Sequence, residues 1–232
     1  MTKEPDSLKW IDAMAPGSVF WDIAANVGVL TLYAATRGDL KVWAFEPVAV
    51  NYFNLVANCE LNHLKDRIRC LQLGFGHNHK IANLHVSQFM PVRSFTFKQS
   101  KKPDAKRKSV PSIQAVQLST SSSRDTARCP NYLKIDAPSF TPEIFVGAWK
   151  TLANPALRQI QVEIKKSKGD PRIAELLAQF GFKPVGQEMR PGQVQRDLVF
   201  ARDISRPNAP TTLAPGANTE VAYRRGAAEP SR

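Results

Sequence analysis

The chain has 232 residues and a net charge of +12, and this length suffices for one ordinary domain whose core needs no disulfide or metal. No apolar stretch approaches the ~20 residues that cross a bilayer, and the polar beginning lacks a signal peptide's apolar segment, so we expect a cytoplasmic protein. The 3 cysteines are widely spaced without a C-x-x-C pair, which argues against a disulfide framework or a zinc site and predicts reduced thiols.

The first part of the chain predicts a helix followed by a strand, helix, strand unit. Residues 7–14 have the apolar spacing of a short amphipathic helix. Two apolar, strand-like runs follow at 19–23 and 42–45, and a helical pattern at 28–36 lies between them. Small residues in the turn before this helix allow a ligand to approach the backbone closely.

An acidic residue stands at the end of each of these two strands. Asp22 is the second-to-last residue of the first apolar run, and Glu46 directly follows the second. Ligands of open α/β sheets bind beyond the carboxyl ends of the strands, so both carboxylates are expected to face one crevice. Glu46 is suited to accept hydrogen bonds from a ribose diol, whereas the G-x-G-x-x-G run of a dinucleotide site is absent from the turn.

The remaining apolar patterns continue the alternation of strands and helices. We expect helices at 48–64, 144–152 and 173–180, strands at 68–73, 81–86, 132–136 and 160–164, a turn at 74–76, and an antiparallel closing pair at 182–185 and 197–201. The predicted fold is α/β, a Rossmann-like doubly wound and mostly parallel sheet with an antiparallel closing strand. We expect one domain over residues 1–203.

Two segments lack such periodicity. Residues 90–128 are rich in Pro, Ser, Lys and Arg and predict a basic loop or insertion, and residues 204–232 predict a disordered tail. His77, His79 and His85 lie near the first of these segments, but no Cys or acid completes a ligand set, so no metal site is expected.

The wording of the first turn carries a family resemblance. Residues 22–28 read D-I-A-A-N-V-G, and residues 45–47 read F-E-P. This resembles the S-adenosylmethionine site of the FkbM family of methyltransferases, usually worded D-I-G-A-N-V-G and F-E-P. The resemblance covers roughly residues 15–165 and continues at Asn51, Leu55, Asn58, Lys134-Ile135-Asp136, Gly147-Ala148 and Val162-Glu163.

The resemblance implies a class I methyltransferase fold, S-adenosylmethionine as cofactor, and methylation of a hydroxyl on a small molecule or glycan. It assigns cofactor binding to Asp22, Ala24, Asn26, Gly28 and Glu46. Alternatively, Asp22 caps the next helix and Gly28 relieves packing.

Asp136 falls on the family's K-I-D, and we predict it as the catalytic acid that positions or deprotonates a hydroxyl. A structural acid remains the alternative for Asp136, and it is the preferred reading for Glu163. Methyl transfer from a sulfonium needs mainly in-line placement of the acceptor and removal of its proton, so one acid in a cleft suffices.

Three departures keep a non-catalytic binding domain open as an alternative. Ala24 replaces the family's glycine, residues 137–139 read A-P-S where V-E-G or V-D-G is usual, and 118–121 lack the acids of the usual S-L-D-D. A nucleic-acid methyltransferase is the less favoured third alternative, supported by charge but lacking an N-P-P-Y-like motif.

Much of the positive charge lies in one segment. Residues 93–108 carry 7 basic residues and one acid. We predict that Lys101, Lys102, Lys106 and Arg107 guide an anionic substrate toward the acceptor cleft, with a solvated insertion without function as the alternative.

Overall fold

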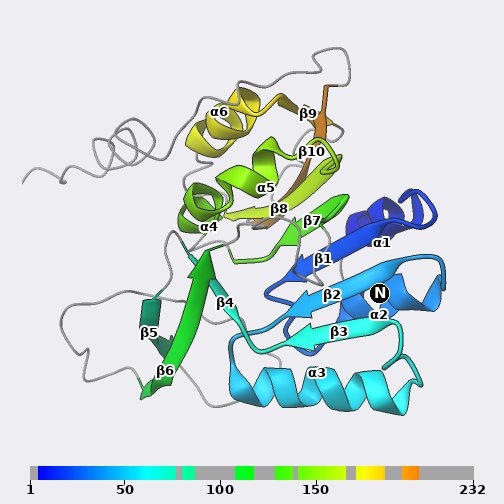
Figure 1. Cartoon of the computed structure of the whole chain (residues 1–232), viewed down its shortest axis with the longest axis vertical. Helices are drawn as coiled ribbons and strands as arrows, with labels where there is room; N and C mark the ends of the chain where they lie inside the picture. Colours follow the sequence, from blue (N-terminus) through cyan, green and yellow to red (C-terminus); the bar gives the residue numbers. More distant parts are fainter. Residues whose placement is uncertain are drawn as a thin grey trace, which may run out of the picture.

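The computed structural model describes residues 5–76, 80–86, 108–117, 129–137, 141–165, 171–185 and 195–203. Figure 1 shows these residues as two sheets with helices around the larger one. The predicted tail at 204–232 and the predicted guiding residues Lys101, Lys102, Lys106 and Arg107 lie outside the described residues. Within them, no helix combines the length and apolar character needed to span a membrane.

The large sheet has the predicted mostly parallel arrangement. Its strands are β1 (Val19–Ile23), β2 (Lys41–Phe45), β3 (Ile68–Leu71), β7 (Tyr132–Ile135), β8 (Gln159–Lys165), β9 (Phe182–Val185) and β10 (Gln195–Arg202). Their order across the sheet is β3-β2-β1-β7-β8-β10-β9. β10 pairs antiparallel with both β8 and β9, which confirms the predicted antiparallel closing pair.

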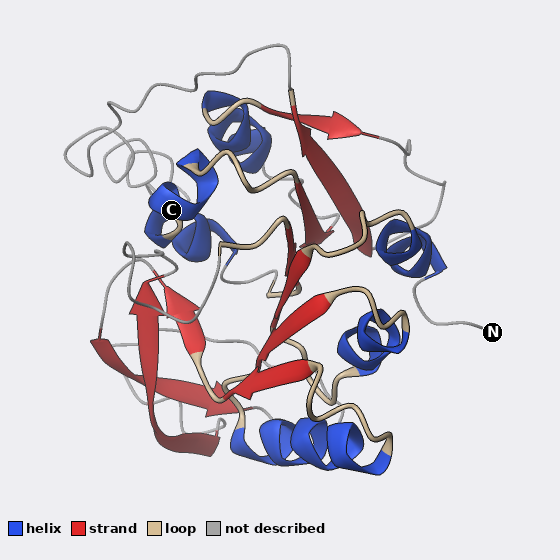
Figure 2. Cartoon of the chain, turned by 45° about the vertical axis from the view of Figure 1, so that its right-hand side comes forward, coloured by secondary structure: helices blue, strands red, loops and turns tan. Residues whose placement is uncertain are grey.

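Helices cover both faces of this sheet, as Figure 2 shows. They are α1 (Pro5–Asp12), α2 (Val29–Thr36), α3 (Ala49–Leu61), α4 (Thr141–Gly147), α5 (Trp149–Ala153) and α6 (Pro171–Gln179). Alternate residues of β1 point to opposite faces. Phe20 joins the core formed with α1, α2 and α3, while Trp21 and Ile23 join the core formed with α4, α5 and α6.

A second, three-stranded sheet corrects two expectations. It consists of β4 (Gly74–Gly76), β5 (Lys80–Val86) and β6 (Lys108–Gln117), in the order β4-β6-β5. Residues 74–76 therefore form a strand where a turn was predicted, and 108–117 form a strand inside the predicted loop. Pro111 and the flanking lysines weaken the strand pattern in the sequence of β6. This segment is a strand because its backbone pairs with β4 and β5.

The small sheet contacts the large one near the carboxyl end of β2. The rings of Phe45 in β2 and Phe75 in β4 meet edge to face, with centroids 4.9 Å apart. Phe75 is also packed against the core that contains α4. The small sheet thus lies beside the carboxyl edge of the large sheet, where the predicted ligand-binding residues lie.

The strand order changes direction between β1 and β7. The chain runs from β1 outward to β2 and β3, then returns to β7 on the other side of β1. Such a switch point leaves a crevice at the carboxyl edge, because the connections of the two flanking strands lead away to opposite sides. Asp22 near the end of β1 and Asp136 directly after β7 flank this position.

Candidate active site

The turn from β1 into α2 has an unusual backbone. Ala24, Asn26 and Gly28 adopt positive φ values of 63°, 56° and 90°. A Cβ on Gly28 would lie 2.4 Å from Cδ1 of Leu55 in α3, so both the backbone angle and the close approach of α3 require glycine there. The turn is held by backbone bonds, from Ala25 N–H to the Phe45 carbonyl (3.0 Å) and from Gly28 N–H to the Ala25 carbonyl (2.9 Å).

Glu46 lies directly after β2 and ties this turn to the start of α3. Its Oε2 accepts the N–H of Asn26 at 2.8 Å, and its Oε1 accepts the N–H of Val48 at 2.9 Å. The side chain is buried, and this burial raises the pKa of Glu46 to about 7 although the two N–H donors oppose the shift. The Asn51 side chain also hydrogen-bonds to Glu46, so one of the roughly four acceptor positions of the carboxylate is left for a hydroxyl.

The side chain of Asp22 points from β1 toward α2. Its Oδ2 accepts the hydroxyl of Thr31 at 2.6 Å, while its Oδ1 has no hydrogen-bond partner among the described residues. Lys134 Nζ lies 4.0 Å from that Oδ1, beyond hydrogen-bond distance. Burial raises the pKa of Asp22, and the Lys134 charge and the Thr31 hydroxyl oppose this shift.

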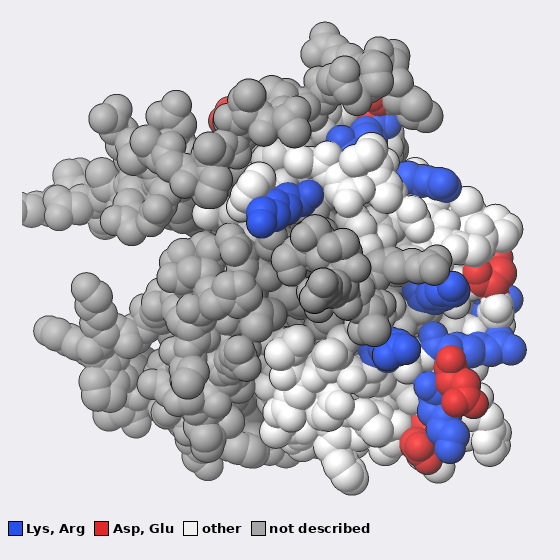
Figure 3. All heavy atoms as spheres, viewed as in Figure 1, with Lys and Arg blue, Asp and Glu red and all other residues white. Residues whose placement is uncertain are grey.

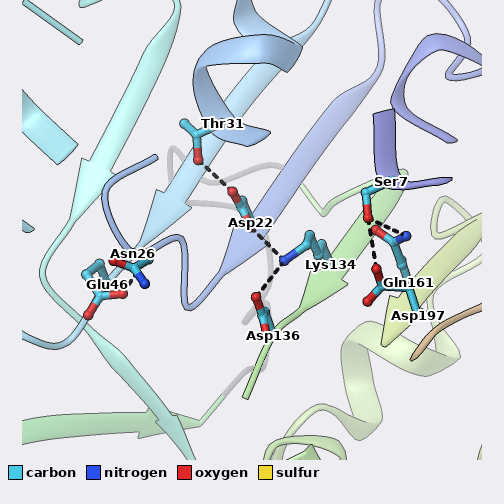
Figure 4. A network of polar contacts seen from close by, with 9 residues as sticks. All are labelled: Ser7, Asp22, Asn26, Thr31, Glu46, Lys134, Asp136, Gln161 and Asp197. Carbon is cyan, nitrogen blue, oxygen red and sulfur yellow. Dashed lines mark hydrogen bonds and ion pairs between the residues drawn. The ribbon is translucent and has the colours of Figure 1, made fainter. Parts of the chain in front are cut away.

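Lys134 is a buried cation in the middle of β7. Its partner in the register of the parallel β1–β7 pair is Asp22. Nζ also lies 3.3 Å from Oδ2 of Asp136, because residues two apart on a strand project to the same face. Figure 4 shows Lys134 reaching between Asp22 and Asp136.

Further carboxyl groups surround Asp136. Glu163 follows Val162, the partner of Ile135 in the β7–β8 pair, and it hydrogen-bonds with Asp136. Asp197 of β10 lies opposite Glu163. Burial first, then the neighbouring carboxyls, raise the pKa of Glu163 to about 8, and burial likewise raises that of Asp197. These acids cannot all be ionised at low energetic cost around one lysine.

Asp22, Lys134, Asp136, Glu163 and Asp197 form one cluster of charged side chains, and helix α1 contacts part of it, as the right side of Figure 4 shows. Ser7 donates to Oδ2 of Asp197 at 3.0 Å and accepts the side-chain amide of Gln161, also at 3.0 Å. Trp10 donates its indole N–H to Oε1 of Gln159 at 2.7 Å. The amphipathic helix predicted near the start of the chain thus contributes polar contacts as well as core residues.

The structure brings the predicted residues to one edge in two groups. The predicted nucleotide residues Asp22, Ala24, Asn26, Gly28 and Glu46 form a continuous arrangement from β1 to β2. Asp136 lies on the other side of Asp22, connected to it by Lys134.

Sequence reasoning gave no role to Lys134, Thr31, Gln161 or Asp197. A lysine inside an otherwise apolar strand, two residues before an acid, is the signal that identifies Lys134 as a buried partner.

Two buried acceptors at this edge have no hydrogen-bond partner in the described part of the chain: Oδ1 of Asp22 and Oδ1 of Asn26. Residues 5–76, 80–86, 108–117 and the later described ranges contain no group of three His, Cys, Asp or Glu that could hold a metal.

Solved methyltransferases share this fold. A methyltransferase FkbM from Methylobacillus flagellatus matches 80% of this chain at 14% identity with a TM-score of 0.55, although the match spans only 43% of that protein. Sp1610 of Streptococcus pneumoniae, named as a candidate tRNA (m1A22) methyltransferase, matches 87% of this chain and 70% of its own at 16% identity and a TM-score of 0.53.

The magnesium protoporphyrin IX methyltransferase of Synechocystis, solved with bound S-adenosylmethionine, matches 85% of this chain and 77% of its own at 11% identity and a TM-score of 0.51. A scan against protein-family models gives no match, and a search of curated proteins gives no significant one. The comparisons therefore establish the fold: the chain has the Rossmann-like architecture of class I methyltransferases.

Proposed function

We propose that the chain is an S-adenosylmethionine-dependent methyltransferase that methylates a hydroxyl on a small molecule or glycan, as FkbM-type enzymes do. One observation carries the proposal: a buried carboxylate at the end of β2 holds a left-handed turn at the end of β1, and beside it lies a second acid, one oxygen of which accepts no hydrogen bond from the described residues. This arrangement lies at the switch point of a sheet with the methyltransferase strand order.

The residues of the turn and of Glu46 would hold the cofactor. Glu46 would accept a ribose hydroxyl at the acceptor position that Asn26, Val48 and Asn51 leave open. Oδ1 of Asp22 would accept a donor of the amino acid part, because Thr31 already occupies the other oxygen. Gly28, with its φ of 90°, would turn the backbone into α2, whose N-terminus favours negatively polarised groups of the ligand.

Asp136 would accept the proton of the acceptor hydroxyl. When bound, S-adenosylmethionine supplies an electrophilic methyl group on a good leaving group. The Asp136 side chain is 32% exposed, and it is oriented by Lys134 at 3.3 Å and by Glu163. The Lys134 ammonium keeps negative charge at this position stable, so Asp136 can orient a hydroxyl before taking its proton.

Calorimetric titration with S-adenosylmethionine is the first test, and a methylation screen of cell extract with labelled cofactor is the second. Asp136→Asn should leave cofactor affinity within about twofold and lower methyl transfer at least about a hundredfold, the usual size of a general-base contribution. Failure of the parent protein to bind S-adenosylmethionine would contradict the proposal. Binding without transfer to any acceptor would favour the non-catalytic alternative that Ala24 and residues 137–139 keep open.

A nucleic-acid acceptor is the second candidate, favoured by the net charge of +12 and by the likeness to the candidate tRNA methyltransferase. Figure 3 shows basic side chains of the described residues at the right of this face mixed with acidic ones, without a continuous basic surface. RNA binding whose affinity falls steeply with salt would support this candidate. Salt-insensitive or absent RNA binding would favour a small-molecule or glycan acceptor.

A further inference from the structure

Two thiols lie against each other between α3 and β3. Cys59 in α3 and Cys70 in β3 have their sulfur atoms 3.7 Å apart, and both are free thiols in the structure. A disulfide requires these atoms to approach to about 2.05 Å. The third thiol, Cys129, contacts the carbonyl of Pro130 and serves as an internal control.

Each of the two cysteines is adjacent in sequence to a residue that holds the candidate nucleotide site. Asn58, next to Cys59, donates its side-chain amide to the carbonyl of Val27 at 2.9 Å. Leu71, next to Cys70, accepts the N–H of Glu46 at 3.1 Å through its carbonyl. A bond between the two sulfur atoms therefore acts on the elements that support both the turn and Glu46.

The pair also has the chemistry for oxidation. Cys59 is buried, whereas Cys70 is partly exposed and gives a small oxidant access. The hydrogen bond with Cys70 lowers the pKa of the Cys59 thiol, and the same contact raises that of Cys70. A thiolate beside a second thiol is the arrangement in which a sulfenic acid is resolved as a disulfide.

We propose that Cys59 and Cys70 form a peroxide-oxidisable dithiol whose disulfide links α3 to β3 and weakens nucleotide binding at the adjacent site. In the first step the Cys59 thiol releases its proton, its thiolate attacks one peroxide oxygen, the O–O bond breaks, and the leaving hydroxide takes up the released proton, which gives sulfenic acid and water. In the second step the Cys70 sulfur attacks the sulfenic sulfur, the S–O bond breaks, and the S–S bond and a second water form. The two thiols lose two electrons and two protons in total, and one peroxide is reduced to two waters.

The direction of the effect on binding follows from the tight contact between α3 and the turn. Leu55 already leaves no space for a Cβ on Gly28, so drawing α3 toward β3 displaces the side chains that fit around the turn. Formation of the disulfide does not depend on the proposed function. The effect on binding rests on the proposed S-adenosylmethionine site.

The first experiment tests the disulfide itself. Reduced full-length protein is treated with one equivalent of hydrogen peroxide, remaining thiols are alkylated, and peptides are mapped by mass spectrometry with and without prior reduction. The parent and Cys129→Ser should both yield a peptide pair joined through Cys59 and Cys70, whereas Cys59→Ser and Cys70→Ser should not. Absence of the joined pair in the parent, or joining mainly between chains, would overturn the proposal.

The second experiment measures the effect of the disulfide on cofactor binding. Oxidised parent protein should bind S-adenosylmethionine at least threefold more weakly than reduced protein and should recover after dithiothreitol, whereas peroxide-treated Cys70→Ser should be unchanged. Equal affinity in both states would overturn the effect on the site. Hydrogen exchange gives a readout without ligand: oxidation should change protection of the Ala25 and Gly28 amides, both bonded within the turn. If neither redox state binds the cofactor while the disulfide and the exchange change appear, the proposed function fails and the dithiol assignment stands.

Discussion

The two sides of the carboxyl edge are built on different principles. On the β1–β2 side, four backbone N–H groups hold the turn at 24–28 and Glu46 with hydrogen bonds of 2.8–3.0 Å, two to backbone carbonyls and two to the Glu46 carboxylate. On the β7–β8 side, side chains from separate strands gather around Lys134, and their charges balance only in part. The first side therefore depends on local backbone conformation, and the second on the protonation states of a shared cluster. The predictions below separate these two dependences, beginning with the largest effect.

Lys134→Met should destabilise the fold most, because it removes the cation from a buried cluster. The expected loss is about 3–5 kcal/mol in the free energy of unfolding. Asp22, Glu163 and Asp197 have raised pKa values, so their contributions to stability are present at low pH and are lost as pH rises. Without Lys134 this loss becomes larger, and urea unfolding should show a greater defect at alkaline than at acidic pH.

The exposed Lys41→Met is the control for this prediction. It should change stability by no more than about 0.5 kcal/mol at either pH. A Lys134→Met defect that does not vary with pH would show that the aliphatic packing of the side chain, and not its charge, stabilises the cluster.

Gly28→Ala should produce the largest effect on the backbone side. The new Cβ would clash with Leu55, and alanine is strained at a φ of 90°. Together these two effects should lower the free energy of unfolding by about 3 kcal/mol. Gly17→Ala isolates the second contribution, since Gly17 has a φ of 76° with nothing within 4 Å of the added Cβ. It should cost only about 1 kcal/mol by the same measurement. Equal losses in the two variants would mean that α3 moves away from the turn without difficulty.

Glu46 links the backbone side to pH. Its pKa of about 7 lies above that of an ordinary glutamate, so its contribution to stability is fully present below about pH 4.5 and is lost as pH rises through about 7. Ligand hydroxyls prefer the ionised carboxylate, so S-adenosylmethionine affinity should instead rise about tenfold between pH 6 and 8, following the ionised fraction. Calorimetry on the parent protein and on Glu46→Gln checks this, and the variant should show a flatter profile. A parallel pH dependence in both proteins would assign the effect to Asp22.

The same division decides what the sequence could predict. The strand, turn, helix pattern and the acids at 22 and 46 are local, so the sequence could predict that the turn at 24–28 lies beside Asp22 and Glu46, while their role in cofactor binding stays a prediction. The antiparallel closing strand was predicted too, because a short strand after a helix and glycine has few ways to continue the sheet. β6 was missed because its ten residues become a strand only through pairing with β4 and β5.

The cluster around Lys134 shows the limit of sequence reasoning more sharply. Lys134, Gln161 and Asp197 are far apart in the chain, and only the register of β7, β8 and β10 brings them to one face. The pattern predicts that each strand exists, but not which residues of two strands lie opposite each other. The roles proposed for the site residues remain predictions that binding and transfer experiments decide.

The smallest expected effect concerns Ala24, where the resemblance calls for glycine. Its φ is 63°, the left-handed region in which a Cβ costs about 1–2 kcal/mol, and glycine's extra freedom in the unfolded chain offsets up to about 1 kcal/mol of that cost. Ala24→Gly should therefore stabilise the fold by less than about 1 kcal/mol. It should also tighten S-adenosylmethionine binding by up to about tenfold, because the methyl group lies in the turn that the ligand would approach.

His63→Gly separates these two effects. His63 has a φ of 57° in the turn after α3 and is exposed, so its replacement should stabilise the fold by a similar amount. Its affinity for the cofactor should equal that of the parent, since His63 follows α3 outside the turn at 24–28. A gain in affinity for Ala24→Gly alone would show that the methyl group obstructs the ligand. Equal stabilisation with unchanged affinity in both variants would show that the turn has adapted to alanine, and weaker binding by Ala24→Gly would mean that the methyl group itself contacts the ligand.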